Sequence, residues 1–252
     1  MSVCCSRLVK NVFTCAGMLD KEEPPISGRE LNKRLRDEAE MWAQGDRRDF
    51  WGHLTQHVHP QIPSHIQQSL DNFNFEHVKP GLAIEFGCGN SILVSELLKK
   101  GWKVEAVDNS RQALAHLQQR IGQTVAEKMD NLTLVCADME TYQFPSDTRF
   151  IVAKDSLPYC NPDKIVEVWD KAYESLEDGG RIAGNFFPRP CNREVEAVQR
   201  GMMGAWFTDK AVVQSLLDKE SYEVETCEYS KPRYRELFYK EPRQINFAGQ
   251  KL

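Results

Sequence analysis

The sequence predicts an α/β protein with a doubly wound, mostly parallel sheet of seven strands. From Gly81 onward, apolar runs of about five residues alternate with helical stretches, which is the pattern of parallel strands covered by helices on both faces. No helical stretch separates the last two runs, so these two strands should pair antiparallel to each other. Before Gly81 the periodicity is helical only.

Each element of this sheet can be assigned from its apolar pattern. The strands are expected at residues 82–86, 103–107, 132–136, 150–154, 181–187, 221–229 and 243–252. Helices that separate strands are expected at residues 91–101, 110–121, 162–180 and 208–219. Gly179 and Gly180 predict a turn that ends the third of these helices and leads into the fifth strand.

The chain before this unit divides into two parts. Residues 1–26 end in two prolines, which do not allow a helix to continue, and we expect them to be a poorly ordered lead-in. Residues 27–79 contain helical patterns and are expected to form a lid. The lid would cover a site in the third part, residues 80–252.

Composition narrows the class of protein. The chain has 252 residues, of which 41% are hydrophobic, enough for one sizeable core, and its net charge of −5 argues against nucleic acid as a partner. No apolar run reaches the roughly 18 residues of a membrane helix, and charged residues interrupt the N-terminal stretch where a signal peptide would need apolar ones. We therefore expect a cytoplasmic protein with reduced cysteines and no membrane partner, although a signal-less export route would leave no mark in these features.

A glycine turn after the first strand is the strongest functional signal. Gly87 and Gly89 follow that strand directly, and Asp108 ends the second strand, about 20 residues further on. Glycines let the backbone approach a ligand, and a carboxylate at Asp108 can accept hydrogen bonds from two ribose hydroxyls. The pattern predicts a nucleotide-type cofactor beyond the carboxyl ends of the strands.

The spacing of this turn favours S-adenosylmethionine over a dinucleotide. The dinucleotide pattern G-x-G-x-x-G would need a third glycine where this chain has Ile92. Glu85, two residues before the first glycine, is an acid that can hold the ammonium of S-adenosylmethionine directly or through water. The loop residues expected to bind the cofactor are Glu85, Gly87, Cys88 and Gly89.

The series EFGCGNS, VDNS, ADME, AKDSLPY and LEDGGRIAGNFF resembles the motifs of class I S-adenosylmethionine-dependent methyltransferases over about residues 80–252. Small-molecule enzymes of the tellurite-resistance and thiopurine type are the most similar. The resemblance implies a Rossmann-like methyltransferase fold with an antiparallel last strand and N-terminal helices, and methyl transfer to a small-molecule acceptor. Ser91, small and a good helix starter, stands where the family often has a third glycine.

The resemblance also assigns residues around the adenine. Asp138, after the third strand, would accept a hydrogen bond from the adenine amino group, with Met139 and Glu140 beside the ring. Asn109 would lie against the other face of the ring. A cap at a turn is the alternative use of Asp138.

The end of the fourth strand is expected to face the reacting groups. The backbone near Lys154 would bind the ammonium, and Asp155 and Tyr159 are candidate catalytic residues beside the acceptor. The string DSLPY differs from the [N/D]-P-P-[Y/F/W] loop of amino-directed enzymes by one additional residue, so nitrogen specificity is not transferred. A structural turn at Pro158 is an equal alternative.

Five of the six histidines fall between His53 and His77. Their spacing matches no zinc signature, so no metal is expected. Trp51 and His53 are predicted in the lid, Trp51 against the cofactor and His53 as a candidate general base. Aromatic core packing with surface histidines is the alternative interpretation.

These observations predict an S-adenosylmethionine-dependent methyltransferase that acts on a small molecule. Two other functions stay open: an S-adenosylmethionine-binding regulatory or interaction protein without transferase activity, and a methyltransferase acting on protein or nucleic acid. Residues 229–243, rich in basic and aromatic side chains, would dock a protein partner, or are simply a solvated loop. The sequence does not specify the acceptor or its attacked atom.

Overall fold

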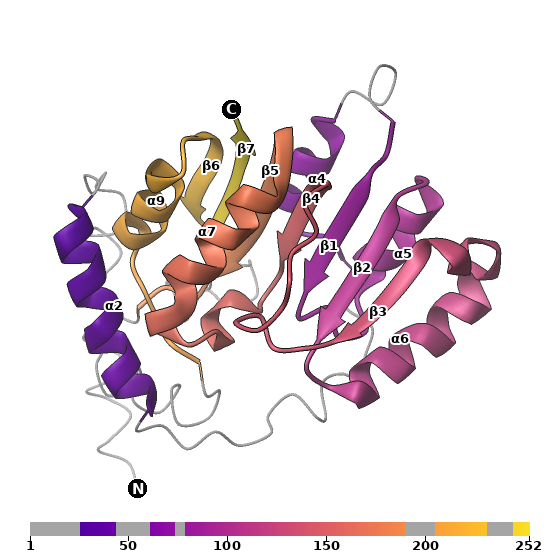
Figure 1. Cartoon of the computed structure of the whole chain (residues 1–252), viewed down its shortest axis with the longest axis horizontal. Helices are drawn as coiled ribbons and strands as arrows, with labels where there is room; N and C mark the ends of the chain where they lie inside the picture. The colour runs from indigo at the N-terminus through magenta and orange to yellow at the C-terminus, as the bar shows by residue number, and fades with distance from the viewer. Residues whose placement is uncertain (1–25, 44–60, 74–78, 190–204, 231–243) are drawn as a thin grey trace, which may run out of the picture.

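A seven-stranded sheet in the order β3-β2-β1-β4-β5-β7-β6 forms the centre of the molecule (Figure 1). The structure is a computed structural model, and it describes residues 26–43, 61–73, 79–189, 205–230 and 244–252. The strands are β1 (Leu82–Phe86), β2 (Lys103–Asp108), β3 (Leu132–Cys136), β4 (Thr148–Ala153), β5 (Leu176–Phe186), β6 (Tyr222–Tyr229) and β7 (Ile245–Lys251).

The direction of the strands follows from their connections. The pairs β1–β2, β2–β3, β1–β4 and β4–β5 are parallel, whereas β7 is antiparallel to both of its neighbours, β5 and β6. A strand that follows another without a crossover helix must reverse direction. The predicted doubly wound, mostly parallel sheet with an antiparallel last strand is therefore confirmed.

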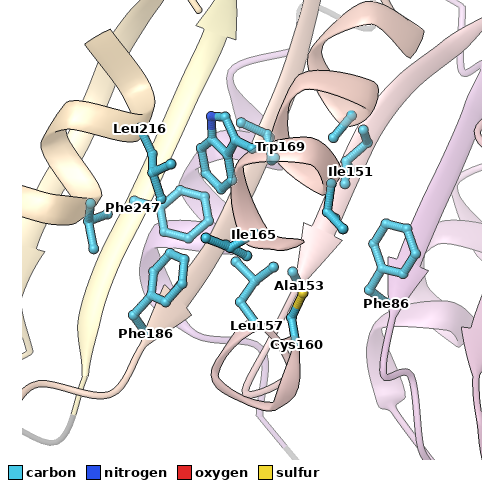
Figure 2. Packing of buried hydrophobic residues seen from close by; sticks show 14 of the residues in the cluster. Phe86, Ile151, Ala153, Leu157, Cys160, Ile165, Trp169, Phe186, Leu216 and Phe247 are labelled. Carbon is cyan, nitrogen blue, oxygen red and sulfur yellow. The ribbon is translucent and has the colours of Figure 1, made fainter. Parts of the chain in front are cut away.

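Helices cover both faces of the sheet and bury two apolar clusters. Helices α4 (Ser64–Asp71), α5 (Ile92–Lys99) and α6 (Arg111–Thr124) contribute to one cluster, and α2 (Gly28–Ala43), α7 (Ile165–Ser175) and α9 (Lys210–Lys219) to the other. Figure 2 shows the second cluster, where Trp169 of α7 packs on Phe247 of β7 with ring centroids 5.2 Å apart. In β4, for example, alternate residues enter opposite clusters, which explains why this strand has a continuous apolar run.

Helices α5, α6 and α9 begin at polar residues that cap their free N–H groups. Ser91, Ser110 and Asp209 each accept a backbone hydrogen bond from the first turn of α5, α6 and α9, respectively, at 3.1 to 3.2 Å. Such caps contribute about 1 kcal/mol each. They fix the points at which α5 and α6 begin, directly after the loops that follow β1 and β2.

The Gly-Gly pair does not end a helix as the sequence predicts. Helix α7 ends at Ser175, and β5 begins at Leu176 and runs through Gly179 and Gly180. The register with β4 shifts in this stretch, and Gly179 has a φ of 76°. The glycines therefore lie in an irregular stretch of β5, where Gly179 supplies the left-handed conformation that interrupts the regular pairing with β4.

The two N-terminal helices that the structure describes lie on opposite faces of the sheet. Leu31 and Leu35 of α2 pack in the α7–α9 cluster, and Arg34 binds Asp209 at 2.8 Å. Helix α4 instead packs against β5 and β7, with Ile66 fully buried. Residues 1–25 and 44–60 lie outside the described residues, so the predicted lid over residues 27–79 stays a prediction. Within the described ranges, no helix is both long and apolar enough to cross a membrane.

Candidate functional site

The strand order reverses between β1 and β4, and this point defines the site. The chain leaves β1 toward β2 on one side and leaves β4 toward β5 on the other. Loops that diverge in this way leave a crevice beyond the carboxyl ends of the strands, where open α/β sheets bind their ligands. The cofactor-binding residues predicted from the sequence and described by the structure all follow β1, β2, β3 or β4, or lie within them.

The glycine loop after β1 depends on its two glycines for different reasons. Gly87 and Gly89 have φ angles of 57° and 49°, in the left-handed region that disfavours side chains. A Cβ on Gly87 would lie 2.5 Å from Cβ of Ser156, whereas a Cβ on Gly89 would meet nothing within 4 Å. Gly87 thus permits close contact with the loop after β4, and Gly89 borders open space that a ligand can fill.

Cys88 lies between these glycines, and its side chain is buried in the apolar core. The thiol is buried in the cluster under α5, and the Cys88 N–H donates to the Val107 carbonyl at 3.1 Å. Burial raises the pKa of this thiol well above its usual value. Only the backbone of Cys88 is therefore available to a ligand.

Asp108, at the end of β2, links the glycine loop to α6. Its Oδ2 accepts a hydrogen bond from the Gly89 N–H at 2.8 Å, and its Oδ1 accepts one from the Ser110 N–H at 2.8 Å. Burial raises the pKa of this carboxyl, and the two N–H donors oppose that shift. Each oxygen keeps a second lone pair, so the carboxylate can still accept two hydroxyls of a bound diol.

Glu85 lies beneath the glycine loop as a fully buried carboxyl. Burial raises its pKa to about 7, while the Ser91 hydroxyl and the positive charges of Lys154 and Arg120 act in the opposite direction. Among the described residues, none is hydrogen-bonded to its Oε2. A positive charge on a ligand at the glycine loop would therefore favour the ionised form of Glu85 near neutral pH.

Arg120 holds the far side of the loop and is not apparent from the sequence. From α6, its guanidinium donates to the Asn90 side chain at 2.7 Å and to the Ser91 carbonyl and Ser95 hydroxyl. From the sequence alone, an arginine in an amphipathic helix is ordinarily predicted to be exposed to solvent. Nothing in its local sequence indicates that it reaches a loop so far away along the chain.

The four residues predicted around the adenine fall into two groups with different contacts. The Asn109 amide donates to Asp138 Oδ1 at 3.0 Å, which joins the loops after β2 and β3. Met139 packs against the α7-side cluster, and Glu140 accepts a hydrogen bond from the Asn161 N–H at 2.8 Å. Asn109 and Asp138 thus lie together at the edge of the crevice, while the Glu140 carboxylate holds the loop after β4.

The two predicted catalytic residues after β4 have different surroundings. Asp155 is the second residue after β4, has a φ of 54°, and is hydrogen-bonded to Asn185 and Gln244. Tyr159 belongs to the short helix η2 (Leu157–Tyr159) and packs edge-on against Phe187 with ring centroids 6.0 Å apart. Asp155 therefore belongs to a polar network, and Tyr159 to a small aromatic cluster.

The predicted lid residues Trp51 and His53 lie outside the described residues, as do residues 231–243 of the basic loop. In the part of the chain that is described, no group of three or more His, Cys, Asp or Glu residues could hold a metal ion. A different histidine approaches the site: His65, at the start of α4, lies 3.0 Å from the Gly184 carbonyl through Nε2. Burial lowers its pKa to about 4, so it is neutral at pH 7.

Comparison with known proteins agrees with this geometry. Residues 83–180 match the family model of a methyltransferase domain. The fold is that of the class I S-adenosylmethionine-dependent methyltransferases. The matched segment includes every predicted cofactor-binding residue that the structure describes. No curated protein sequence matches the chain.

Three similar solved structures illustrate the range of this methyltransferase fold. Magnesium protoporphyrin IX methyltransferase from Synechocystis PCC 6803, with bound SAH, is 16% identical, with a TM-score of 0.58 over 81% of this chain and 94% of that one. A Burkholderia thailandensis 1,6-didemethyltoxoflavin-N1-methyltransferase, with bound 1,6-didemethyltoxoflavin and S-adenosylhomocysteine, is 14% identical, with a TM-score of 0.55 over 92% and 93% of the chains. Haemonchus contortus phosphoethanolamine N-methyltransferase 2, in complex with S-adenosylmethionine, is 17% identical, with a TM-score of 0.59 over 73% and 52%.

Glu85→Gln should change how stability depends on pH. The folded protein holds the Glu85 proton up to a pH of about 7, whereas the unfolded chain releases it near 4.5. The stability that this raised pKa confers is fully present below pH 4.5 and is lost as pH rises through 7. Relative to the variant, the wild type should lose about 3 kcal/mol across this window in urea unfolding.

His65→Asn provides a control of opposite sign. The pKa of His65 is lowered from 6.5 to about 4, so its contribution is present above pH 6.5 and is lost as pH falls through 4. If the free energy of unfolding of Glu85→Gln depends on pH in the same way as that of the wild type, Glu85 does not have the raised pKa of a buried carboxyl.

Proposed function

We propose that the chain is an S-adenosylmethionine-dependent methyltransferase that uses the crevice between β1 and β4. The observation that carries the proposal is the Asp108 carboxylate, which is held against the glycine loop by the Gly89 N–H and retains free lone pairs. A carboxylate in this position fits the two ribose hydroxyls of an adenosyl group. Ile92, the first residue of α5, occupies the place of the glycine that a dinucleotide turn requires.

The rest of the crevice fits the other parts of S-adenosylmethionine. The open space beside Gly89 admits the cofactor, and the joined Asn109 and Asp138 side chains offer an amide and a carboxylate to the adenine. The buried Glu85, with its unpaired oxygen, favours the positive charge of the methionine part. When bound, S-adenosylmethionine supplies an electrophilic methyl group on a sulfonium leaving group.

The protein's own contribution to the chemistry is alignment. Holding an acceptor in line with the methyl group can lower the barrier by about 7 kcal/mol or more. Asp155, and Tyr159 in η2, follow β4 and are the residues of the described part that we assign to the acceptor. Trp51 and His53 remain our candidates for a cofactor contact and a general base in the lid.

A small molecule is the acceptor that we favour. The support is the resemblance to enzymes of the tellurite-resistance and thiopurine type, together with structural neighbours named for small substrates, such as phosphoethanolamine and 1,6-didemethyltoxoflavin. A cofactor-binding regulatory protein without transferase activity is the main alternative. Methylation of protein or nucleic acid, with residues 229–243 as the docking surface, is the other.

Asp108→Ala should weaken binding of S-adenosylmethionine about a hundredfold, because the ribose loses two hydrogen bonds to a charged group. Isothermal titration calorimetry measures this directly. Asp130→Ala is the matched control, since Asp130 is an exposed aspartate in the 3-10 helix η1 (Ala126–Asn131) and should leave affinity unchanged. Binding of NAD in place of S-adenosylmethionine would contradict the proposal.

Turnover separates an enzyme from a binding protein. With a panel of small thiols, amines and phenols, the wild type should release S-adenosylhomocysteine, and the Asp108→Ala variant should be strongly impaired at cofactor concentrations below saturation. Tight cofactor binding with no release on any small acceptor would favour the regulatory alternative. Release only with protein or RNA present would favour the macromolecular one.

A further inference from the structure

The glycine loop after β1 is a segment that other parts of the chain have to hold in place. Gly87 and Gly89 are both in the left-handed region, and glycine loses more conformational freedom than any other residue when it becomes ordered. A ligand that must order such a loop binds more weakly than one that meets the loop already ordered. Contacts that fix the loop in the free protein therefore bear on the affinity for a cofactor.

Arg120 of α6 makes three such contacts where the loop joins α5. Its Nε donates to the Asn90 side chain at 2.7 Å, and its two terminal nitrogens donate to the Ser91 carbonyl and the Ser95 hydroxyl. Asn90, Ser91 and Ser95 are all buried. Because the guanidinium is a planar, rigid group, its three bonds hold the end of the loop and the start of α5 together as one body.

Ser91 is held at each of its polar groups. Its N–H donates to the Cys88 carbonyl at 2.9 Å, and its hydroxyl accepts from the Leu93 N–H at 3.1 Å. Both of these contacts are local, whereas the bond from Arg120 to the Ser91 carbonyl comes from a different helix. Arg120 thus fixes the loop relative to α6.

Helix α6 also holds the carboxylate assigned to the ribose. The N–H of Ser110, the cap of α6, donates to Asp108 Oδ1, and the Gly89 N–H donates to Asp108 Oδ2, both at 2.8 Å. These contacts close a ring that runs from α6 through Asp108 and Gly89 into the loop and returns to α6 through Arg120. The ring fixes the position of the loop relative to the Asp108 carboxylate.

The charge of Arg120 acts on a second group beneath the loop. Its three acceptors are neutral, and burial lowers the pKa of Arg120, while attraction by the Glu85 carboxyl opposes this shift. In return, Arg120 opposes the rise in the pKa of Glu85 that burial causes. Of the other charges near Glu85, Lys154 acts in the same direction as Arg120, and Asp108 acts against both. Arg120 therefore favours the ionised form of Glu85, as a cationic ligand would.

We propose that Arg120 is a positioning residue that determines the affinity for S-adenosylmethionine without touching it, because it holds the glycine loop in its binding conformation and favours the ionised form of Glu85. The inference rests on the proposed function and concerns the same crevice. A residue that only stabilised the fold would change the free energy of unfolding and leave the affinity of the folded protein unchanged.

Calorimetry with S-adenosylhomocysteine tests the proposal without a known acceptor. Arg120→Met keeps much of the apolar stem but removes the charge and all the donors, and it should bind this ligand about tenfold or more weakly than the wild type. Arg120→Lys keeps the charge but lacks the planar group that reaches three acceptors, so its affinity should lie between the two.

Arg149→Met is the matched control. Arg149 is also half-buried and also joins distant parts of the chain, since it donates to the Glu177 carboxylate at 2.8 Å and to the Lys79 carbonyl. These contacts lie at the amino ends of β4 and β5, at the edge of the sheet opposite the crevice. The variant should be less stable in urea unfolding, yet its affinity for S-adenosylhomocysteine should stay within about twofold of the wild type.

Ser95→Ala is a milder variant that keeps the test decisive if Arg120→Met does not fold. It removes one acceptor of Arg120 within α5 and leaves the loop sequence unchanged. It should weaken binding of S-adenosylhomocysteine about twofold to threefold. In the Arg120→Met protein the same substitution should cause no further loss, because the contact is already absent.

The pH dependence of binding separates the charge of Arg120 from its hydrogen bonds. The affinity of the wild type for S-adenosylhomocysteine should rise as pH rises through about 7, because the ionised Glu85 attracts the ammonium of the ligand. In Arg120→Met this rise should occur at a higher pH. In Arg120→Lys and Arg149→Met it should occur at the same pH as in the wild type, and a role limited to folding would not move it.

Three results would overturn the inference. These are an equal loss of affinity in Arg120→Met and Arg149→Met, unchanged affinity in both Arg120→Lys and Ser95→Ala, and a pH dependence that is the same in Arg120→Met as in the wild type. If the wild type itself does not bind S-adenosylhomocysteine, the proposed function fails, which is a different outcome.

Discussion

The carboxyl edge of the sheet is shaped by the contact between the loop after β1 and the loop after β4. A side chain at Gly87 would collide with Ser156, so the two loops approach as closely as backbone and a small side chain allow. This contact lies where the strand order reverses, and the loops separate beyond it. The left-handed residues at Gly87, Gly89 and Asp155 all occur beside this contact.

The carboxyl groups at this edge favour a ligand that carries a positive charge. The fully buried Glu85 and the half-buried Asp108 both have raised pKa values, because burial disfavours their ionised forms. The nearby Arg120 and Lys154 offset this cost for Glu85 only in part. A ligand that brings a positive charge to the glycine loop would relieve it further, which agrees with a sulfonium cofactor carrying an ammonium group.

The sequence predicts the features that depend on neighbouring residues. Strand periodicity, the missing crossover helix before β7, the glycine turn and Asp108 are all visible in short stretches of chain, and the structure has the predicted sheet. A glycine pair after a helix is compatible with a turn and also with an irregular strand, so the sequence alone predicts a turn at Gly179 and Gly180 where the structure has β5. Arg120, His65 and Gln244 act through contacts far apart along the chain, which no local pattern records. Trp51 and His53 lie outside the described residues and stay predictions.

A crystal structure of the protein with S-adenosylhomocysteine tests the central claim most directly. The account predicts that both ribose hydroxyls bind Asp108 within hydrogen-bond distance, that the adenine lies beside Asn109 and Asp138, and that the sulfur lies near Asp155. A ligand bound elsewhere, or a ribose that does not contact Asp108, would contradict it.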